Sequence, residues 1–198
     1  MYVHGQGVID NDKTAVKWYT KAAEQGFAQT QYNLGVMYEI GRGVLENDKT
    51  AAFWWKKAAE QGHVSAQSNL GVMYEKGFGV VENDKTAVKW FTKAAEQGDA
   101  IAQLKLGIMY DNGKGVLEND KTAVKWYIKA AEQGYAHAQN NLGRMYANGE
   151  GVLTSDIKAY MWWSIAAYNS DKTGASNKDI ITKQMTNEQI AKAQELSQ

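Results

Sequence analysis

The sequence predicts an all-α solenoid, in which antiparallel helix pairs stack one after another. A motif of the form Gly-x-Gly-Val recurs at intervals of 36 residues and starts at Gly5, Gly41, Gly77, Gly113 and Gly149. A tryptophan follows the same step, at Trp18, Trp54, Trp90, Trp126 and Trp162. Self-similarity at a fixed period of this length is typical of helical repeats, in which each unit buries its apolar face against its neighbours.

One full repeat, residues 27–62, begins with a segment that reads as a helix from Ala28 to Ile40. Gly41 and Gly43 follow this segment. Glycine adopts positive φ without steric cost, so we expect the pair to end the helix and turn the chain. The connection to the next helical run is short, and a short loop makes neighbouring helices antiparallel.

The second helix of the repeat is expected in the run KTAAFWWKKAAEQ. Asp48 precedes the run, and its carboxylate is expected to cap the helix by accepting a hydrogen bond from a first-turn N–H. Gly62 follows the run, where helices often end with a left-handed residue. Ala51, Trp54 and Ala58 share one helical face, and Trp55 and Ala59 widen it. This predicts an apolar stripe in which an alanine admits the tryptophan of a neighbouring helix.

The charge and composition of the chain exclude several kinds of partner. Lysine plus arginine and aspartate plus glutamate each number 22, so the formal net charge is zero. A neutral chain has no overall field that attracts nucleic acid or an anionic membrane, so we expect neither. No stretch approaches the roughly 20 apolar residues of a membrane span, and residues 1–10 lack the apolar core of a signal peptide. We therefore expect a soluble monomer without membrane insertion.

The sequence offers no catalytic or metal-binding constellation. It has no cysteine, and its histidines, His4, His63 and His137, occupy different positions in their repeats. No two of them have the i, i+4 spacing that places metal ligands on one helix face. Acidic residues recur with the repeat, for example at Asp48 and Asp84, as expected of helix caps rather than of one catalytic carboxylate in a special environment. We therefore expect no enzyme activity, no cofactor and no metal.

The segments LGVMYEIGRGV and DKTAAFWWKKAAEQG resemble the Sel1-like repeat, a relative of the tetratricopeptide repeat with a longer loop between its helices. The resemblance covers a half repeat at 1–26 and full repeats at 27–62, 63–98, 99–134 and 135–170. It implies a right-handed α/α superhelix that serves as an adaptor or scaffold for protein complexes. Such proteins are common in bacteria and often periplasmic or secreted, which is the location expected here if a segment precedes Met1.

The end of the chain departs from the repeat, because AAEQG becomes AAYNS at 166–170. We expect a polar loop around 169–178 and then a final helix, NEQIAKAQELSQ, which starts with a capping box of Thr186 and Gln189. The chain thus divides into a repeat solenoid, residues 1–170, and a C-terminal capping helical segment, residues 171–198. This segment would cover the exposed face of the last helix pair.

Comparison of the repeats separates recurrent positions from variable ones. On the first helix, recurrent residues such as Leu34 and Tyr38 lie on one side, and the variable ones fall within about a 100° arc on the opposite side. In the tetratricopeptide-like solenoids that the chain resembles, first helices line the inner, concave surface. The variable stripe is therefore the candidate partner-binding groove, with Tyr32, Val36, Val72, Ile101, Leu104, Ile108, His137, Asn140 and Arg144 as its residues.

The third repeat carries the apolar part of this stripe. Ile101, Leu104 and Ile108 have the i, i+3, i+7 spacing of one helix face, next to polar residues of the fourth repeat. An apolar centre with a polar rim is typical of an interface, and it would suit an amphipathic helix or an extended peptide. The other interpretation is that these residues pack against the next helix or the C-terminal tail.

The sequence therefore predicts an adaptor that binds a partner protein or peptide in this groove. Two alternatives stay open. Met1 stands at the place of Met37 in the repeat, and this incomplete first repeat fits a regulatory module of a longer polypeptide with a catalytic or membrane domain elsewhere. A small-ligand pocket around His137, Asn140 and Arg144 is the second alternative, although no catalytic constellation supports it.

Overall fold

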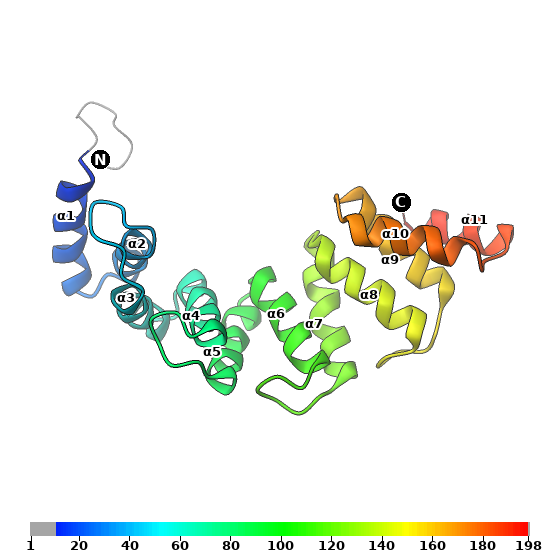
Figure 1. Cartoon of the computed structure of the whole chain (residues 1–198), viewed down its shortest axis with the longest axis horizontal. Coiled ribbons are helices and arrows are strands. Elements are labelled where there is room, and N and C mark those ends of the chain that lie inside the picture. The colour runs from blue at the N-terminus through cyan, green and yellow to red at the C-terminus, as the bar shows by residue number, and fades with distance from the viewer. Residues whose placement is uncertain (1–10, 198) are drawn as a thin grey trace. The chain divides into compact units, whose positions relative to one another are not determined.

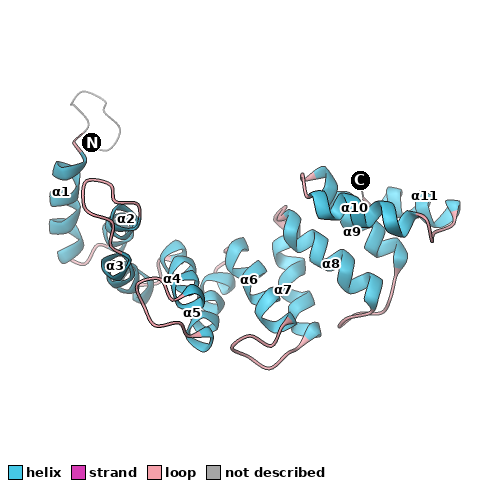
Figure 2. Ribbon diagram, in the orientation of Figure 1, coloured by secondary structure: helices cyan, strands magenta, loops and turns pink. Residues whose placement is uncertain are grey.

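The structure is a computed structural model that describes residues 11–197, and within these residues every regular element is a helix (Figures 1 and 2). The all-α prediction is confirmed. Residues cluster into two compact units, Met1–Asp99 and Ala100–Gln198, which are described separately below. The first glycine pair, Gly5 and Gly7, and His4 lie outside the described residues.

The first unit holds helices α1 to α5, and the second holds α6 to α11. The helices of the first unit are α1 (Asp12–Glu24), α2 (Ala28–Glu39), α3 (Asp48–Glu60), α4 (Val64–Lys76) and α5 (Asp84–Glu96). Those of the second unit are α6 (Ala100–Asp111), α7 (Asp120–Glu132), α8 (Ala136–Asn148), α9 (Asp156–Tyr168), α10 (Lys172–Thr182) and α11 (Asn187–Leu196).

Successive helices pack on one another within each unit. In the first unit α2 packs on α3 and α4 on α5, and in the second α6 packs on α7 and α8 on α9. These pairs are the two-helix repeats that the period of 36 residues predicts. Neighbouring pairs are joined through contacts of α3 with α4 and of α7 with α8. Each unit is therefore a stack of helix pairs.

The second helix of each repeat is capped one residue earlier than the sequence predicts. Asp48 is the first helical residue of α3, and Asn47 before it accepts a hydrogen bond from the Thr50 N–H at 2.9 Å. Asn47 is therefore the N-cap, and the prediction that Asp48 caps the helix is wrong. Asparagine and aspartate are equally good N-cap residues, so residue preference does not distinguish the two neighbours. Asp48 instead lies in the first turn, where a negative charge interacts favourably with the helix dipole.

The glycines of the interhelical loops have the predicted left-handed backbone. Gly41 and Gly43 have φ of 66° and 73°, and Gly62 beyond α3 has φ of 90°. Gly43 carries a second constraint, because a Cβ there would lie 2.6 Å from the carbonyl carbon of Asp12. The loop of one repeat thus lies directly against the start of the second helix of the repeat before it.

The most deeply buried aromatic ring stands one residue after the recurrent tryptophan. Trp55 is 1% exposed, whereas Trp54 is half-buried and Trp18 is 57% exposed. Trp90 is the member of the recurrent set that is buried. The predicted stripe is therefore buried at Ala51, Trp55, Ala58 and Ala59, whereas Trp54 is half-buried and packs on the core of α1 and α2.

A glycine of the first helix makes room for that buried ring. In the pair α4 and α5, a Cβ on Gly71 would lie 2.7 Å from the Phe91 ring. Gly35 faces Trp55 in the same way, and in the second unit Gly107 faces Tyr127 and Gly143 faces Trp163. Because each first helix has hydrogen in place of a side chain here, the ring of the second helix packs directly on its backbone.

Recurrent amide side chains join successive pairs. Gln31 is 3% exposed, donates to the carbonyl of Ala23 at 2.9 Å, and accepts from the side chain of Gln61 at 2.7 Å. Buried amides are usually hydrogen-bonded in this way. The amide-to-amide bond recurs at Gln97 and Gln67, at Gln133 and Gln103, and at Asn169 and Gln139.

The C-terminal segment contains a helix, α10, where the sequence predicts a polar loop. The prediction of a loop at 169–178 is wrong from Lys172 onward. Asp171 is 6% exposed and caps α10 by accepting a hydrogen bond from the Gly174 N–H at 2.7 Å. The predicted final helix is present as α11, and its capping box of Thr186 and Gln189 is confirmed. Both α10 and α11 pack on α9.

Candidate partner-binding groove

In the first unit, the predicted groove residues Tyr32, Val36 and Val72 are all half-buried. Tyr32 and Val36 pack against the apolar core formed by α3 and α4. The Tyr32 ring also stacks on the imidazole of His63, with ring centroids 4.6 Å apart. These side chains therefore contribute to the contact between neighbouring repeats and leave only part of their surface open.

Side chains in the N-terminal part of the variable stripe contact the helix that follows on the same side of the stack. In the second unit, the Nδ1 atom of His137 in α8 lies 2.8 Å from the carboxylate of Asp171, which caps α10. Asn140 of α8 accepts a hydrogen bond from the side chain of Asn177 in α10 at 3.1 Å. The structure thus places His137 and Asn140 against α10. Arg144, one turn further along α8, instead lines a hollow together with residues of α6 and α7.

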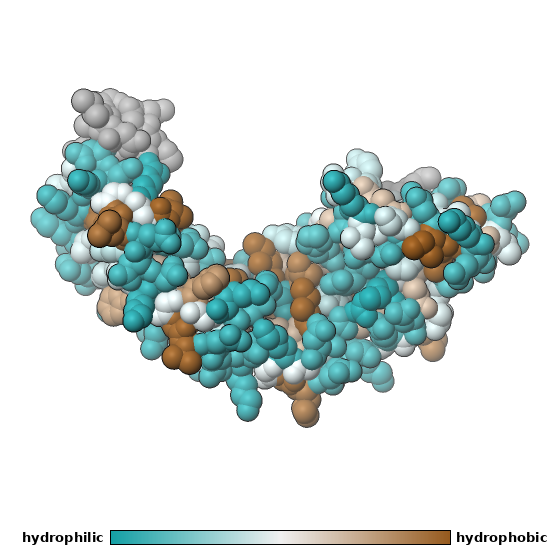
Figure 3. Space-filling model, viewed as in Figure 1, coloured by the Kyte–Doolittle hydropathy of each residue, from teal (hydrophilic) through white to brown (hydrophobic). Residues whose placement is uncertain are grey.

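The apolar residues of α6 form a ridge, defined here as Ile101, Leu104 and Ile108. Ile101 is 46% exposed, and Leu104 and Ile108 are half-buried because they pack on the core of α7 and α8. Apolar side chains gather over α6 on the face that Figure 3 shows. The ridge therefore has features of both interpretations of the stripe. Leu104 and Ile108 pack on the next repeat, and the ridge still presents apolar surface at Ile101.

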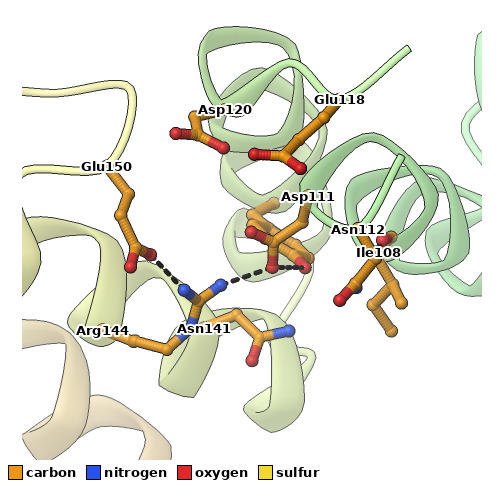
Figure 4. A pocket seen from close by; sticks show the side chains of 9 residues that line it. Ile108, Asp111, Asn112, Glu118, Asp120, Asn141, Arg144 and Glu150 are labelled. Carbon is orange, nitrogen blue, oxygen red and sulfur yellow. Dashed lines mark hydrogen bonds and ion pairs between the residues drawn. The ribbon is translucent and has the colours of Figure 1, made fainter. Parts of the chain in front are cut away.

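A hollow of about 610 Å³ opens next to this ridge, within the second unit. Ile108 belongs both to the ridge and to the lining of the hollow. The other lining residues come from the end of α6, from α7, from α8 and from the two interhelical loops, and are Asp111, Asn112, Glu118, Asp120, Tyr127, Asn141, Arg144 and Glu150. Figure 4 shows the carboxylates of Glu118 and Asp120 pointing into the space above Arg144.

A polar network forms the floor of the hollow. The guanidinium of Arg144 pairs with Asp111 and with Glu150 (Figure 4). Asp111 also accepts a hydrogen bond from the Tyr127 hydroxyl at 3.0 Å. The network connects α6, α7 and α8 with the loop that follows α8, and so fixes the position of Arg144.

The network shifts the pKa values of its members. Burial raises the pKa of the Tyr127 hydroxyl, and the negative charge of Asp111 raises it further. Burial alone would lower the pKa of Arg144, but the hydrogen bond and charge of Asp111, with the charge of Glu150, outweigh it and raise the pKa. Tyr127 is therefore a neutral donor and Arg144 a permanent cation at any physiological pH.

These residues depart from the repeat pattern. Where the fourth repeat has Arg144, the earlier repeats have Val36, Val72 and Ile108, and where it has Glu150, they have Arg42, Phe78 and Lys114. Sequence reasoning selected Arg144 but missed Asp111, Tyr127 and Glu150. A comparison of loop and second-helix positions between repeats would have found Glu150, whereas Asp111 replaces a glutamate of like charge and gives no such signal.

Two further properties of the described chain bear on its function. Among residues 11–197, no group of three or more histidine or acidic side chains is placed to hold a metal ion. Of the helices in this part of the chain, none is long and apolar enough to cross a membrane.

The sequence pattern of the Sel1 repeat matches residues 1–27, 28–63, 64–99, 100–135 and 136–171. The chain belongs to the Sel1 repeat family. Sel1 repeats form a non-catalytic helical scaffold, and proteins built from them generally mediate protein–protein interaction. The resemblance deduced from the segments LGVMYEIGRGV and DKTAAFWWKKAAEQG is thereby confirmed.

Solved structures with the same fold come from bacteria. A Sel1 repeat protein from Oxalobacter formigenes is 41% identical, with a TM-score of 0.82, over 87% of this chain and 71% of that protein. A protective antigen with this fold from uropathogenic Escherichia coli strains is 30% identical, with a TM-score of 0.57, over 100% of this chain and 58% of that protein. Cysteine rich protein B of Helicobacter pylori is 29% identical, with a TM-score of 0.52, over 68% of this chain and 97% of its own. No curated protein sequence matches the chain.

Proposed function

We propose that this chain is an adaptor that binds a partner protein or peptide on the surface lined by the first helices of its repeats. One observation carries the proposal: within the second unit, the apolar ridge of α6 adjoins a polar hollow of about 610 Å³. The ridge residues and, in the hollow, Arg144 and Glu150 vary between repeats, whereas Glu118 and Asp120 stand at recurrent acidic positions and the buried glycines, glutamines and alanines recur. Variation at positions that the stack does not require is what a specific interface needs.

The ridge supplies the apolar centre of the proposed interface, and the hollow supplies its polar rim. Such a surface fits a helix that lays an apolar face on Ile101 and Ile108, or an extended peptide that alternates apolar and polar side chains. The proposal assigns residues 1–170 to the binding solenoid and 171–198 to a segment that covers its last helix pair. The packing of α10 and α11 on α9 supports this division.

Affinity capture from an extract of the native cell, with the wild-type chain and two variants side by side, tests the proposal. Ile101→Asp places a charge on the exposed part of the ridge. Ile180→Asp is a matched control, because Ile180 of α10 is 56% exposed and lies off the variable stripe. A charge in the apolar centre of an interface costs a few kcal/mol, so we expect Ile101→Asp to lose a retained partner by at least ten-fold.

Both variants should keep the helical circular dichroism and melting temperature of the wild type, since both side chains are largely exposed. Loss of the partner in Ile101→Asp alone supports the proposal. Equal retention by the wild type and Ile101→Asp, or loss only in Ile180→Asp, would move the binding surface away from the first helices.

A further inference from the structure

One pair of repeat positions carries an ion pair at the start of the chain but not in the later repeats in which Phe78 and Glu150 take the place of Arg42. In the first unit, the Nε atom of Arg42, in the loop between α2 and α3, binds the carboxylate of Asp12 at 2.8 Å. Asp12 is the first residue of α1. Three repeats later, the position of Asp12 is held by Asp120 and the position of Arg42 by Glu150. A carboxylate, Glu150, thus stands opposite Asp120 at the position from which the guanidinium of Arg42 neutralises Asp12.

Within the second unit, the guanidinium of Arg144 is the cation that lines the hollow, and it already has ion-pair partners. Arg144 is paired with Asp111 and Glu150. No ion pair joins Glu118 or Asp120 to a cation in the described residues, 11–197. Four carboxylates and a single guanidinium therefore line the hollow. The hollow therefore has an excess of negative charge, and the carboxylates of Glu118 and Asp120 lie across it from Arg144 (Figure 4).

The ridge determines which kind of cation fits. Ile108 lines the hollow and also belongs to the ridge with Ile101 and Leu104, so a ligand that enters the hollow also meets apolar surface. A free inorganic cation would use only the carboxylates. A peptide that carries a basic side chain and an aliphatic side chain one helical turn away would use both surfaces.

We propose that the hollow of the second unit is a subsite for a lysine or arginine side chain of the partner, held by Asp120 and Glu118 as Arg42 is held by Asp12. An aliphatic side chain three or four residues away packs on Ile108 and Ile101. This inference rests on the proposed function and narrows it to a basic, amphipathic segment. Ion pairs of this kind also supply specificity, because an acidic segment is repelled by the same carboxylates.

A display library of random 12-residue peptides is the probe that tests the inference. It is selected against the wild-type chain, against Glu118→Gln/Asp120→Asn, and against Glu46→Gln/Asp48→Asn. The last variant removes the same two charges at the same repeat positions in the first unit, and so controls for net charge. Ile101→Asp is added to test the ridge, and the melting temperature of each variant shows that it is folded.

We expect wild-type selections to enrich peptides with lysine or arginine three or four residues from leucine, isoleucine or valine. The best such peptide, measured by fluorescence anisotropy, should bind Glu118→Gln/Asp120→Asn at least ten-fold more weakly and the control variant within two-fold. A ten-fold loss corresponds to about 1.4 kcal/mol, as expected when a charged hydrogen-bond partner is removed. Its affinity should also fall as salt is raised, because the pair is partly exposed.

The outcomes separate this inference from the function on which it rests. Peptides that depend on Ile101 but show no basic preference, or that bind Glu118→Gln/Asp120→Asn as well as wild type, would overturn the cationic subsite and leave the groove in place. Selections that depend on neither Ile101 nor the acidic pair would overturn both. Binding that calcium chloride competes away at constant ionic strength would assign the carboxylates to a metal ion instead, and would also overturn the subsite.

Discussion

At the scale of single residues, a recurrent close contact joins the glycine of each first helix to the ring of the second helix of the same pair. Gly71 and Phe91 illustrate it in the first unit, where both residues are buried. Glycine in a helix interior normally costs about 1 kcal/mol relative to alanine. The recurrence of glycine at this position therefore has to be explained by the ring that occupies the space of a Cβ.

We expect Gly71→Ala to destabilise the first unit by about 1–3 kcal/mol, although alanine is the better helix former, because overpacking a core forces neighbours to shift. Chemical denaturation followed by circular dichroism measures the effect. In a Phe91→Ala background the ring is absent, so the same substitution should be neutral or stabilising, and the double-mutant cycle isolates the contact. A stabilising Gly71→Ala in the otherwise wild-type chain would contradict the packing argument.

The recurrent residues could be read from the sequence, but their partners could not. The period identifies Gly35, Gln31 and the aromatic pairs as fixed by the architecture, yet it treats Trp54 and Trp55 alike. Which of two neighbouring rings faces the first helix depends on the rotation of one helix against the other, and a period of 36 residues carries no information about that angle. The same reason hides the bond between Tyr127 and Asp111, which lie on different helices.

At the scale of the helices, most ends are marked by local chemistry that a sequence shows, and a few are not. The asparagine caps and loop glycines lie beside the ends that they define. The start of α10 is different, because Asp171 is a buried cap whose other oxygen is bound by His137, 34 residues earlier. A polar segment whose cap depends on such a distant partner reads as a loop, and this is why the expected loop at 169–178 is a helix.

The start of α4 depends on an unusual cap, which leads to a pH prediction. The Nδ1 atom of His63 accepts a hydrogen bond from the Ala66 N–H at 3.3 Å, while Nε2 lies 3.3 Å from the side-chain oxygen of Gln29. Nδ1 can accept only when the ring is neutral. Burial lowers the pKa of His63, and a backbone hydrogen bond of the residue opposes this in part.

Because the folded pKa lies below the unfolded value of about 6.5, the unfolded chain takes up a proton first as the pH falls. The stability contributed by neutral His63 is therefore fully present above pH 6.5 and is lost as the pH falls below it, down to the folded pKa. We expect the denaturation midpoint of the wild type to drop between pH 7.5 and 5.5 by more than that of His63→Asn, in which asparagine keeps a cap but does not titrate. Parallel pH profiles for the two chains would show that His63 does not titrate as proposed.

At the scale of the whole molecule, the residues that hold the helices together and most residues of the proposed groove are different sets. The alanines, glycines and glutamines that recur with the period form the contacts between helices, so the sequence alone predicts the architecture. The ridge residues and Arg144 do not recur, and a helix-face argument places Ile101, Ile108 and Arg144 on one surface. It could not predict the hollow, because Glu118 and Glu150 reach it from loops, and Asp120 from the start of α7, at places that depend on the stacking of repeats.

This separation predicts that the fourth repeat can be returned to the pattern of the third without loss of the fold. In Arg144→Ile/Glu150→Lys, both positions take the residues found at Ile108 and Lys114. Replacing a partly buried ion pair by an apolar residue is often neutral, and Asp111 keeps its hydrogen bond from Tyr127. We expect the free energy of unfolding to stay within about 1 kcal/mol of wild type.

Binding of the selected peptide should fall at least ten-fold, since the introduced lysine side chain then occupies the place of the incoming cation. The single variant Arg144→Ile, which leaves Asp111 and Glu150 without their cation, should be the less stable of the two; a double variant that unfolds would mean that the lining of the hollow is part of the fold itself.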